Sequence, residues 1–355
     1  MPFGRLKMKK DSKIYVAGHK GLVGSAIMEN LKAKGYTNLV HRSHQELDLT
    51  HQEAVAEFFA KEKPQYVFLC AAKVGGIISN DTYRADFIYQ NLAIQNNIIH
   101  QSYLNGVEKL LFLGSTCIYP KNAPQPMNED CLLSGILEYT NEPYAIAKIA
   151  GIKMCESYNL QYKTNFISVM PTNLYGNNDN FDLEKSHLLP ALLRKMHLSK
   201  LLAQDNKEAI CKDVGISDWG QAKAYLEKFG IHKESIEIWG SGNPRRELLH
   251  SSDMADACVF IMENIDFENL CGDSRQIRNT HINIGTGEDK TIRELTNMIK
   301  DIVGFEGEFI FNTQKPDGTM RKLVDCTKLQ NLGWKHQIAL EQGIKMVYEW
   351  YKNKP

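Results

Sequence analysis

The 355-residue chain has no excess of charge of either sign, because 42 lysines and arginines balance 42 aspartates and glutamates. A balanced chain has no general attraction to nucleic acid or to anionic membrane, so we expect neither partner. The sequence also lacks any apolar run close to the roughly 20 residues that span a bilayer. Internal repeats and low-complexity tracts are absent as well.

The eight cysteines are scattered, and the sequence contains no Cys-x-x-Cys pair. This pattern argues against a structural zinc site and a disulfide framework, so we expect no metal. Residues 1–10 are basic and lack the apolar core of a secretory signal. The predicted location is therefore the cytoplasm.

Strand-like and helix-like segments alternate through the first half of the chain. The expected strands are 14–17, 38–41, 66–71, 109–113 and 166–170. The expected helices are 25–34, 52–61, 86–105 and 143–162, with Leu104 among the positions expected to be buried. This alternation predicts an α/β fold with a doubly wound parallel Rossmann sheet, which binds ligands at the carboxyl ends of its strands.

Three glycines, Gly18, Gly21 and Gly24, follow the first expected strand and open a helix. Gly18 permits a tight turn, Gly21 lets the backbone approach a pyrophosphate, and Gly24 allows close packing of helix on strand. The alternative is an ordinary turn between strand and helix. The position of the triplet favours a nucleotide site.

The second expected strand ends in His41-Arg42-Ser43 without the carboxylate that would bind the ribose of NAD. Arg42 can instead hold a 2′-phosphate, and Lys20 adds charge, so NADPH is the predicted cofactor. The alternative for Arg42 is a solvated cation at a strand end. Asp48 and Leu49 are expected near the adenine.

Tyr144 and Lys148 lie four residues apart on an expected helix, and Ser115 follows the strand 109–113. A phenol beside an ammonium can deliver a proton to a carbonyl oxygen, because the lysine is expected to lower the pKa of the tyrosine. Ser115 can hydrogen-bond the same oxygen. The alternative is an amphipathic surface helix, since Tyr-x-x-x-Lys is common.

After about Asn173 the alternation of strand and helix ends. We expect an NADP-binding Rossmann domain over 8–173 and a smaller, mostly substrate-binding C-terminal lobe over 174–355. Some segments of this lobe are expected to return to the Rossmann sheet. Residues 198–235 are polar and lysine-rich and are predicted to be a helical insertion.

Several motifs together resemble the extended short-chain dehydrogenase/reductase family acting on nucleotide sugars, and above all the GDP-L-fucose synthases. The motifs are 71–76 (AAKVGG), 86–91 (DFIYQN), 114–120 (GSTCIYP), 141–148 (NEPYAIAK), 170–176 (MPTNLYG) and 315–319 (KPDGT). These enzymes are 3,5-epimerases and NADPH-dependent 4-reductases of GDP-4-keto-6-deoxy-mannose. The resemblance implies the same activity and a homodimer formed through the helices 86–105 and 143–162.

The resemblance assigns the epimerase base to Cys117 and the acid to His187. The alternatives are a buried core cysteine and a histidine that caps a helix, and both residues could also be idle in a related reductase. Related 4,6-dehydratases carry Asp-Glu at positions 117–118, where this chain has Cys-Ile. The substrate should therefore already be a 4-keto sugar.

Together with the residues argued above, the resemblance completes the expected binding sites. Cofactor contacts fall on Gly18, Lys20, Gly21, Leu22, Val23, Gly24, Arg42, Asp48, Leu49, Ala71, Ala72, Tyr144, Lys148, Pro171, Asn173, Leu174 and His187. GDP contacts fall on Lys195, Trp239, Arg246 and Lys322, although Trp239 could be core and the cations could be surface charges.

Two departures from the family pattern leave the sugar open. The family has Arg at position 195 and Phe at position 248, where this chain has Lys195 and Leu248. The alternative is a C4 reductase without epimerase activity on a related GDP-4-keto-6-deoxy sugar such as a heptose. A more remote alternative is a non-catalytic protein that senses NADP.

Overall fold

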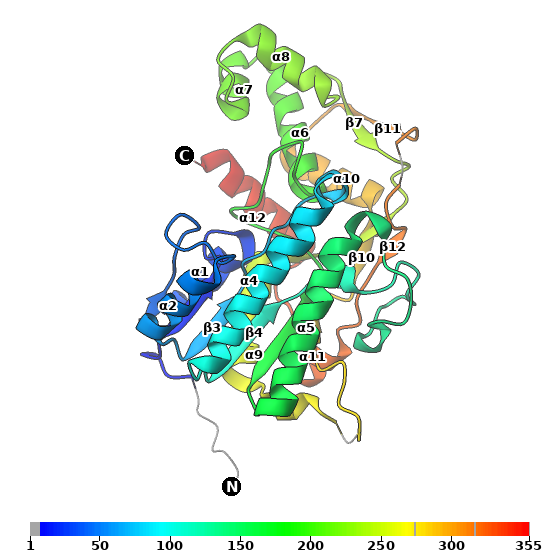
Figure 1. The fold of residues 1–355 in the computed structure, drawn as a ribbon. Coiled ribbons are helices and arrows are strands. Elements are labelled where there is room, and N and C mark those ends of the chain that lie inside the picture. Colours follow the sequence, from blue (N-terminus) through cyan, green and yellow to red (C-terminus); the bar gives the residue numbers. More distant parts are fainter. Residues whose placement is uncertain (1–7, 273–274, 316, 355) are drawn as a thin grey trace. The chain divides into compact units, whose positions relative to one another are not determined.

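Residues 8–272, 275–315 and 317–354 are described by the computed structural model, and they divide into two units (Figure 1). The first unit contains the described residues up to Asn178 together with Leu248–Gly287 and Leu323–Ile338. The second contains Asp179–Glu247, the described part of Glu288–Lys322, and the described residues from Ala339 onward.

A six-stranded parallel sheet with the order β2-β1-β3-β4-β5-β9 forms the centre of the first unit. Its strands are β1 (Ile14–Ala17), β2 (Leu39–Val40), β3 (Tyr66–Leu69), β4 (Lys109–Leu113), β5 (Phe166–Pro171) and β9 (Ile282–Ile284). The chain adds strands on both sides of β1, so the predicted doubly wound Rossmann sheet is confirmed. The inner strands are buried on both faces, which explains their continuous apolar runs.

Helices cover both faces of this sheet. On one face α4 packs against α2 and α5, and on the other α1 packs against α9. Their bounds are α1 (Leu22–Ala33), α2 (Gln52–Glu62), α4 (Arg84–Leu104), α5 (Glu142–Tyr162) and α9 (Ser251–Asn264). Two short helices, α3 (Ile77–Thr82) and α11 (Thr327–Asn331), belong to the same unit.

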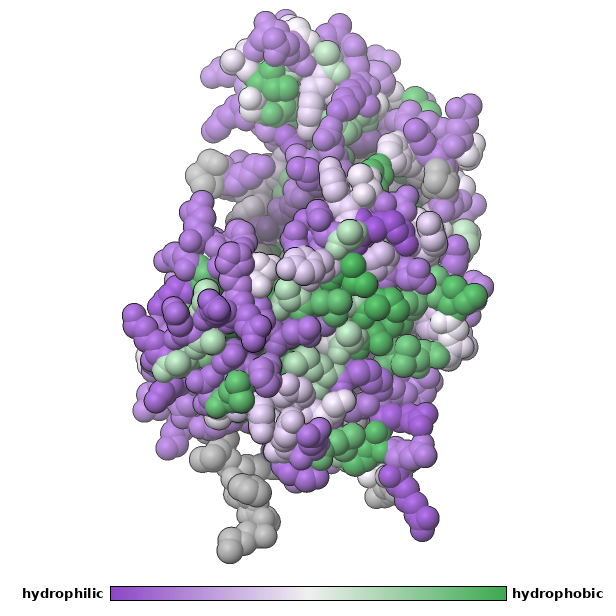
Figure 2. Space-filling model, in the orientation of Figure 1, coloured by the Kyte–Doolittle hydropathy of each residue, from purple (hydrophilic) through white to green (hydrophobic). Residues whose placement is uncertain are grey.

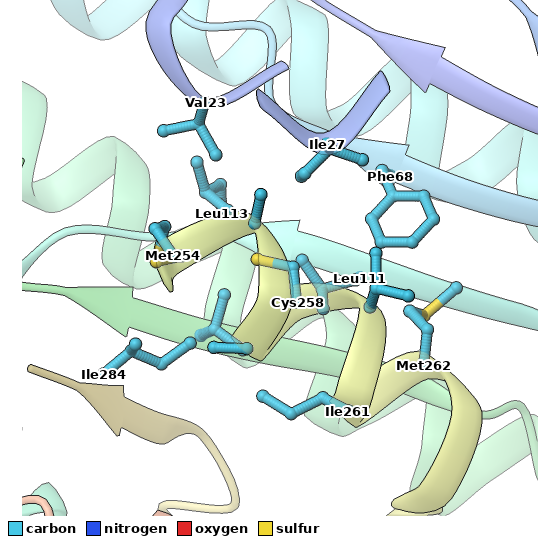
Figure 3. Packing of buried hydrophobic residues seen from close by; sticks show 14 of the residues in the cluster. Val23, Ile27, Phe68, Leu111, Leu113, Met254, Cys258, Ile261, Met262 and Ile284 are labelled. Atoms are coloured by element: carbon cyan, nitrogen blue, oxygen red, sulfur yellow. The ribbon is translucent and has the colours of Figure 1, made fainter. Parts of the chain in front are cut away.

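Helix α9 enters the first unit from a distant part of the sequence. Figure 3 shows Met254, Cys258 and Ile261 of α9 packed among Ile27 of α1 and Leu111 of β4. This core closes one face of the sheet. It leaves the carboxyl edge, where the loops after β1, β3 and β4 emerge, to carry polar side chains.

The second unit is built from helices around short strands. Its helices are α6 (Leu188–Ala203), α7 (Lys207–Val214), α8 (Trp219–Lys228), α10 (Ile292–Val303) and α12 (Leu340–Asn353). Its strands are β7 (Ser235–Trp239), which pairs with β11 (Glu308–Asn312), and β10 (Asp289–Thr291) and β12 (Arg321–Lys322), which flank β8 (Arg245–His250). The last three residues of β8 pair with β6 (Asn173–Tyr175) within the first unit.

The region 198–235 contains the end of α6 and the helices α7 and α8. A small apolar cluster holds these helices together through Leu198, Ile210, Leu226 and Ile231. Arg194 of α6 adds a buried ion pair to Asp213 of α7, with Nε 2.8 Å from Oδ1. Tyr351 of α12 donates its hydroxyl hydrogen to the other oxygen of the same carboxylate.

Within the part of the chain that the structure describes, no helix combines the length and apolar character needed to cross a bilayer.

Candidate active site

Packing within the protein requires glycine at two positions of the turn that follows β1. Gly18 has a φ of +84°, and a Cβ there would lie 2.7 Å from the backbone nitrogen of Ala71. A Cβ on Gly24 would lie 2.1 Å from the carbonyl oxygen of Gly18. The turn therefore packs closely between the segment that follows β3 and the start of α1, as the sequence predicted.

Gly21 differs from these two glycines. A Cβ there would meet only the carbonyl oxygen of Gly18, at an ordinary 3.5 Å. The fold itself therefore does not demand glycine at this position. Because Gly21 is the N-cap of α1, Leu22 and Val23 present N–H groups without intrahelical partners, and the turn fits a phosphate that approaches the backbone closely.

Arg42 is partly exposed to solvent and is held by two contacts. Its Nη2 lies 2.6 Å from Oε1 of Glu62 on α2, and its Nη1 donates to the carbonyl oxygen of His41 at 2.7 Å. The His41 ring stacks on His19 of the glycine turn at 4.2 Å between centroids. Glu62 and the histidine pair were not anticipated, because only the folded sheet brings these segments together.

The loop after β2 is fixed by its own hydrogen bonds. Oδ1 of Asp48 accepts from the backbone nitrogen and hydroxyl of Thr50 at 2.9 and 2.8 Å, and these bonds lower the pKa of Asp48 against the opposing effect of burial. The carbonyl oxygen of the buried Leu49 accepts from Asn97 at 2.9 Å. Both predicted residues thus lie on a rigid segment.

Ala71 and Ala72 follow β3 and lead into a segment that one buried amide holds. Asn91 of α4 donates to the carbonyl oxygen of Lys73 at 3.0 Å and accepts from its backbone nitrogen at 3.1 Å. Asn91 belongs to a motif of the sequence, but its role became visible only in the structure. It fixes the loop that backs the glycine turn.

Ser115, Tyr144 and Lys148 come together at the carboxyl end of β4. Ser115 follows β4 directly and hydrogen-bonds the phenol of Tyr144 on α5. Lys148 is buried one turn further along α5, where its Nζ donates to the carbonyl oxygen of Leu113 at 2.7 Å. The three predicted residues thus form one group within the first unit.

Burial controls the protonation of this group. It raises the pKa of Tyr144, Cys117 raises it further, and the hydrogen bond with Ser115 lowers it. Burial also lowers the pKa of Lys148 to about 8. Lys148 was predicted to lower the pKa of Tyr144, but the pKa of Tyr144 is raised. Burial of the phenol outweighs the effects that lower its pKa, and Nζ of Lys148 is bonded to the carbonyl oxygen of Leu113.

Cys117 lies in a short 3-10 helix, η1 (Thr116–Ile118), where it packs against the edge of the core and stays partly exposed. Its backbone nitrogen donates to Oγ of Ser115 at 3.2 Å. The amide Nδ2 of Asn141 donates to its sulfur at 3.3 Å. Asn141 is a further residue that the sequence did not single out.

Pro171, Asn173 and Leu174 lie at the end of β5 and in β6. The backbone nitrogen of the intervening Thr172 donates to the carbonyl oxygen of Ile284 on β9 at 2.9 Å. This bond fixes the segment at the carboxyl edge of the sheet, where a cofactor contact was predicted.

His187 lies in the second unit, at the N-cap of α6. Its side chain makes no capping hydrogen bond, so the alternative of a capping histidine is not seen. Desolvation lowers the pKa of His187, and Lys322 lowers it further. The lowered pKa favours the neutral imidazole at pH 7.

Arg246 and Lys322 lie opposite each other on the paired strands β8 and β12. Lys290 of β10 lies opposite Arg246 on the other side. Directly paired residues point to the same face of a sheet, so the three cations form a row. Arg246 is further fixed by Nη1, which donates to the carbonyl oxygen of Thr319 at 2.6 Å. Lys290 was not predicted.

Lys195 and Trp239 lie on α6 and at the end of β7. Nζ of Lys195 donates to the carbonyl oxygen of Glu237 at 2.9 Å, and burial lowers its pKa to about 8. Trp239 is 52% exposed, so the alternative of core packing is wrong. The ammonium of Lys315 lies 5.0 Å from its ring centroid.

A family model described as the NAD dependent epimerase/dehydratase family matches residues 14–285. The chain belongs to this family. The GDP-L-fucose synthase 1 of Arabidopsis thaliana is 50% identical over 342 residues, which cover 96% of this chain and 94% of that protein. The predicted family resemblance is thereby confirmed.

Two solved structures from Campylobacter jejuni are also similar. A GDP-6-OMe-4-keto-L-xylo-heptose reductase is 55% identical, with a TM-score of 0.95 over 98% of this chain and 100% of that chain. A GDP-D-glycero-L-gluco-heptose synthase, solved in the presence of NADPH, is 55% identical, with a TM-score of 0.93 over the same shares.

Proposed function

We propose that this enzyme reduces the C4 ketone of a GDP-4-keto-6-deoxy sugar with NADPH and couples the reduction to epimerisation at C3 and C5. The observation that carries the proposal is the joint placement of Ser115, Tyr144 and Cys117. A proton donor for a ketone oxygen and a thiol for the neighbouring C–H bonds lie within one hydrogen-bonded group.

NADPH supplies the hydride when it is bound. Gly21 and the start of α1 receive its pyrophosphate, and Lys20 and Arg42 provide positive charge for the 2′-phosphate. A relative solved in the presence of NADPH supports NADPH as the cofactor. Asp48, Leu49, Ala71 and Ala72 would contact the nucleoside of the cofactor, and Pro171, Asn173 and Leu174 would contact its nicotinamide.

Tyr144 donates a proton to the C4 oxygen as the hydride reaches C4, and Ser115 orients that oxygen. Lys148, one helical turn from Tyr144, places a positive charge beside the reacting group, which favours the negative charge that develops on the ketone oxygen. Because burial raises the pKa of Tyr144, the phenol stays protonated until the oxygen becomes basic.

Epimerisation needs a base and an acid on opposite faces of the sugar. The Cys117 thiolate removes the proton beside the ketone, and the electron pair left on carbon is delocalised onto the C4 oxygen. His187 returns a proton to carbon. Because the pKa of His187 is lowered, less of the protonated form that can donate this proton is present as the pH rises.

The GDP moiety is bound by the second unit. The row of Arg246, Lys290 and Lys322 matches a diphosphate, and Trp239 offers an exposed ring to the guanine. Lys195 contributes a point charge where the family has a bidentate arginine.

A C4 reductase acting on a GDP-4-keto heptose is the second candidate. The similar C. jejuni structures match this alternative, and the departures at Lys195 and Leu248 leave room for it, without favouring it over the first candidate. Cys117 and His187 would then be present without catalysing epimerisation.

The enzyme is expected to act as a homodimer in the cytoplasm. Apolar side chains gather on the face that carries α4 and α5 (Figure 2), and they include Tyr89, which is 67% exposed, and Ile146, which is 41% exposed. A second copy of the chain covers this face in the proposed dimer. The eight free cysteines suit a reducing compartment.

Incubation with GDP-4-keto-6-deoxy-mannose and NADPH in deuterated water tests the proposal, with the product analysed by NMR. Deuterium at C3 and C5 with inverted configuration supports the coupled reaction. Reduction at C4 without deuterium uptake supports the second candidate. An inert enzyme with this sugar and with GDP-4-keto heptoses contradicts both.

A further inference from the structure

Three side chains on one face of α5 reach toward the segment that follows β4. Asn141, Tyr144 and Lys148 are separated by three and four residues, which places them on one side of the helix. Their partners are the sulfur of Cys117 at 3.3 Å, the hydroxyl of Ser115, and the carbonyl oxygen of Leu113 at 2.7 Å. The same face thus contacts both proposed reaction centres.

Asn141 is the N-cap of α5, yet its side chain does not cap the helix. An asparagine at this position normally accepts a hydrogen bond from a backbone N–H of the first turn. Here Oδ1 is enclosed and has no partner among the described residues, while Nδ2 donates to Cys117. The Asn141 amide therefore hydrogen-bonds the Cys117 sulfur and leaves the first turn of α5 without a side-chain cap.

Both partners of this contact are held in place. The backbone nitrogen of Cys117 is bonded to Ser115, and that of Asn141 donates to the carbonyl oxygen of Glu138 at 3.2 Å. Arg84 of α4 donates to the carbonyl oxygen of Tyr139 at 2.8 Å and stacks over its ring at 4.3 Å. The donor thus points at the sulfur from a rigid turn.

We propose that Asn141 is a positioning residue that orients Cys117 and stabilises its thiolate for epimerisation. An N–H donor and the positive end of α5 both favour negative charge on the sulfur. When Cys117 takes the proton from C3 or C5, its S–H bond forms and the hydrogen bond to Asn141 weakens. This inference rests on the proposed epimerase function.

A second asparagine–cysteine pair in the same unit has the opposite polarity. The thiol of Cys131 donates to Oδ1 of Asn128 at 3.5 Å, so this contact favours the neutral thiol. Asn128 also caps its own turn by accepting from the backbone nitrogen of Asp130 at 3.1 Å. The pair therefore supplies a matched control.

Alkylation tests the proposal without any turnover. The rate of iodoacetamide modification of Cys117 is measured by peptide mass spectrometry across pH in the wild type, Asn141→Leu, Asn141→Asp and Asn128→Ala. We expect Asn141→Leu to slow modification near neutral pH by about tenfold and to move the profile to higher pH. Asn141→Asp should move it further, because a carboxylate repels the thiolate, and Asn128→Ala should leave it unchanged.

An unchanged Cys117 profile in Asn141→Leu and Asn141→Asp would overturn the proposal. Loss of the helix start is checked with Asn141→Ser, which can cap α5 but is too short to reach the sulfur as the amide does. This variant should behave like Asn141→Leu in alkylation. Recovery of the wild-type profile by serine would overturn the proposed role of the contact between the amide and the sulfur.

Turnover then separates this inference from the proposed function. Asn141→Leu should reduce deuterium uptake at C3 and C5 about tenfold more than it reduces NADPH oxidation with an already epimerised ketone. Equal losses in both assays would contradict a role confined to Cys117. If the wild type shows no deuterium uptake, the epimerase proposal fails while the alkylation profiles still decide what Asn141 does to the sulfur.

Discussion

At the scale of single residues, the site combines groups whose protonation is set by burial. Lys148 is enclosed and Tyr144 is half-buried, and burial acts on them in opposite directions. Burial disfavours the charged form of each, so it keeps the phenol neutral and weakens the hold of the ammonium on its proton.

Replacing Tyr144 with Phe should lower kcat for NADPH oxidation by about 10² to 10⁴, because it removes the proton donor and leaves the ring in place. NADPH binding, measured by fluorescence titration, should persist. Tyr158→Phe is the matched control on the same helix, where the hydroxyl contacts His100 at 2.8 Å. Near-normal turnover in Tyr144→Phe would refute the assignment.

The rate of reduction should fall as the pH rises through about 8, because the pKa of Lys148 is lowered to about 8. Below this pH the ammonium keeps its charge, and above it the charge is lost. The measurement is kcat/KM against pH with an already epimerised ketone, since this ratio reports groups of the free enzyme. The Lys148→Met variant should have a low kcat/KM that no longer falls as the pH rises through 8. A wild-type kcat/KM that stays constant through pH 8 would contradict the role of the Lys148 charge.

At the scale of elements, the glycine turn separates what the fold needs from what a ligand needs. Gly18 and Gly24 have backbone atoms where a side chain would go, whereas Gly21 has room for a methyl group.

The small sheet of the second unit shows a comparable division. Asp289 accepts hydrogen bonds from Arg245 and Arg321 at 2.7 and 2.5 Å, while the paired row of Arg246, Lys290 and Lys322 lies on the opposite face.

Gly21→Ala and Gly24→Ala should therefore fail in different ways. Gly21→Ala should keep the unfolding temperature and weaken NADPH binding about tenfold or more, because the methyl group blocks the phosphate. Gly24→Ala should lower the unfolding temperature by about 5 °C or more, because its methyl group overlaps the carbonyl of Gly18. Thermal unfolding without ligand and NADPH titration measure the two effects, and equal effects of both variants would contradict the distinction.

Lys290→Ala should raise KM for the GDP-sugar about fivefold with little change in kcat, since a partly exposed cation contributes ~1 kcal/mol. Steady-state kinetics at two salt concentrations provide the measurement, and higher salt should reduce the difference. Lys345→Ala on α12, where the lysine pairs with Glu341, is the control. An unchanged KM for Lys290→Ala would remove this residue from the diphosphate site.

At the scale of the whole molecule, the sequence predicted the Rossmann sheet because short continuous apolar strands alternate with longer helical segments. The site residues Ser115, Tyr144 and Lys148 were predictable because a strand end and a helical spacing fix where they lie. Glu62, Asn91 and Asn141 were not, because their partners are distant in sequence and an ordinary amide or carboxylate carries no local signal.

Leu104 shows the limit of periodicity. It was expected to be buried but is 58% exposed on the last turn of α4. An apolar residue at helical spacing can face a core or a partner chain, and the sequence of one chain does not distinguish them.

The proposed dimer predicts that charge on this face breaks the assembly. Tyr89→Glu combined with Ile146→Arg should convert the protein to a monomer in sedimentation velocity. Met346→Arg, which changes a residue that is 41% exposed on α12, should leave the assembly intact. A monomeric wild type at micromolar concentration would contradict the dimer.

The bond from Tyr351 to Asp213 has a consequence for synthesis on the ribosome. Asp213 also receives Arg194, so the carboxylate that holds α7 to α6 is completed by a residue made more than a hundred positions later. Domains usually fold in the order in which they emerge. Here the hydrogen bond that completes the Asp213 carboxylate forms only after Tyr351 has been made, so a nascent chain stalled before that point should expose the region 198–235 to proteases more than the finished chain does.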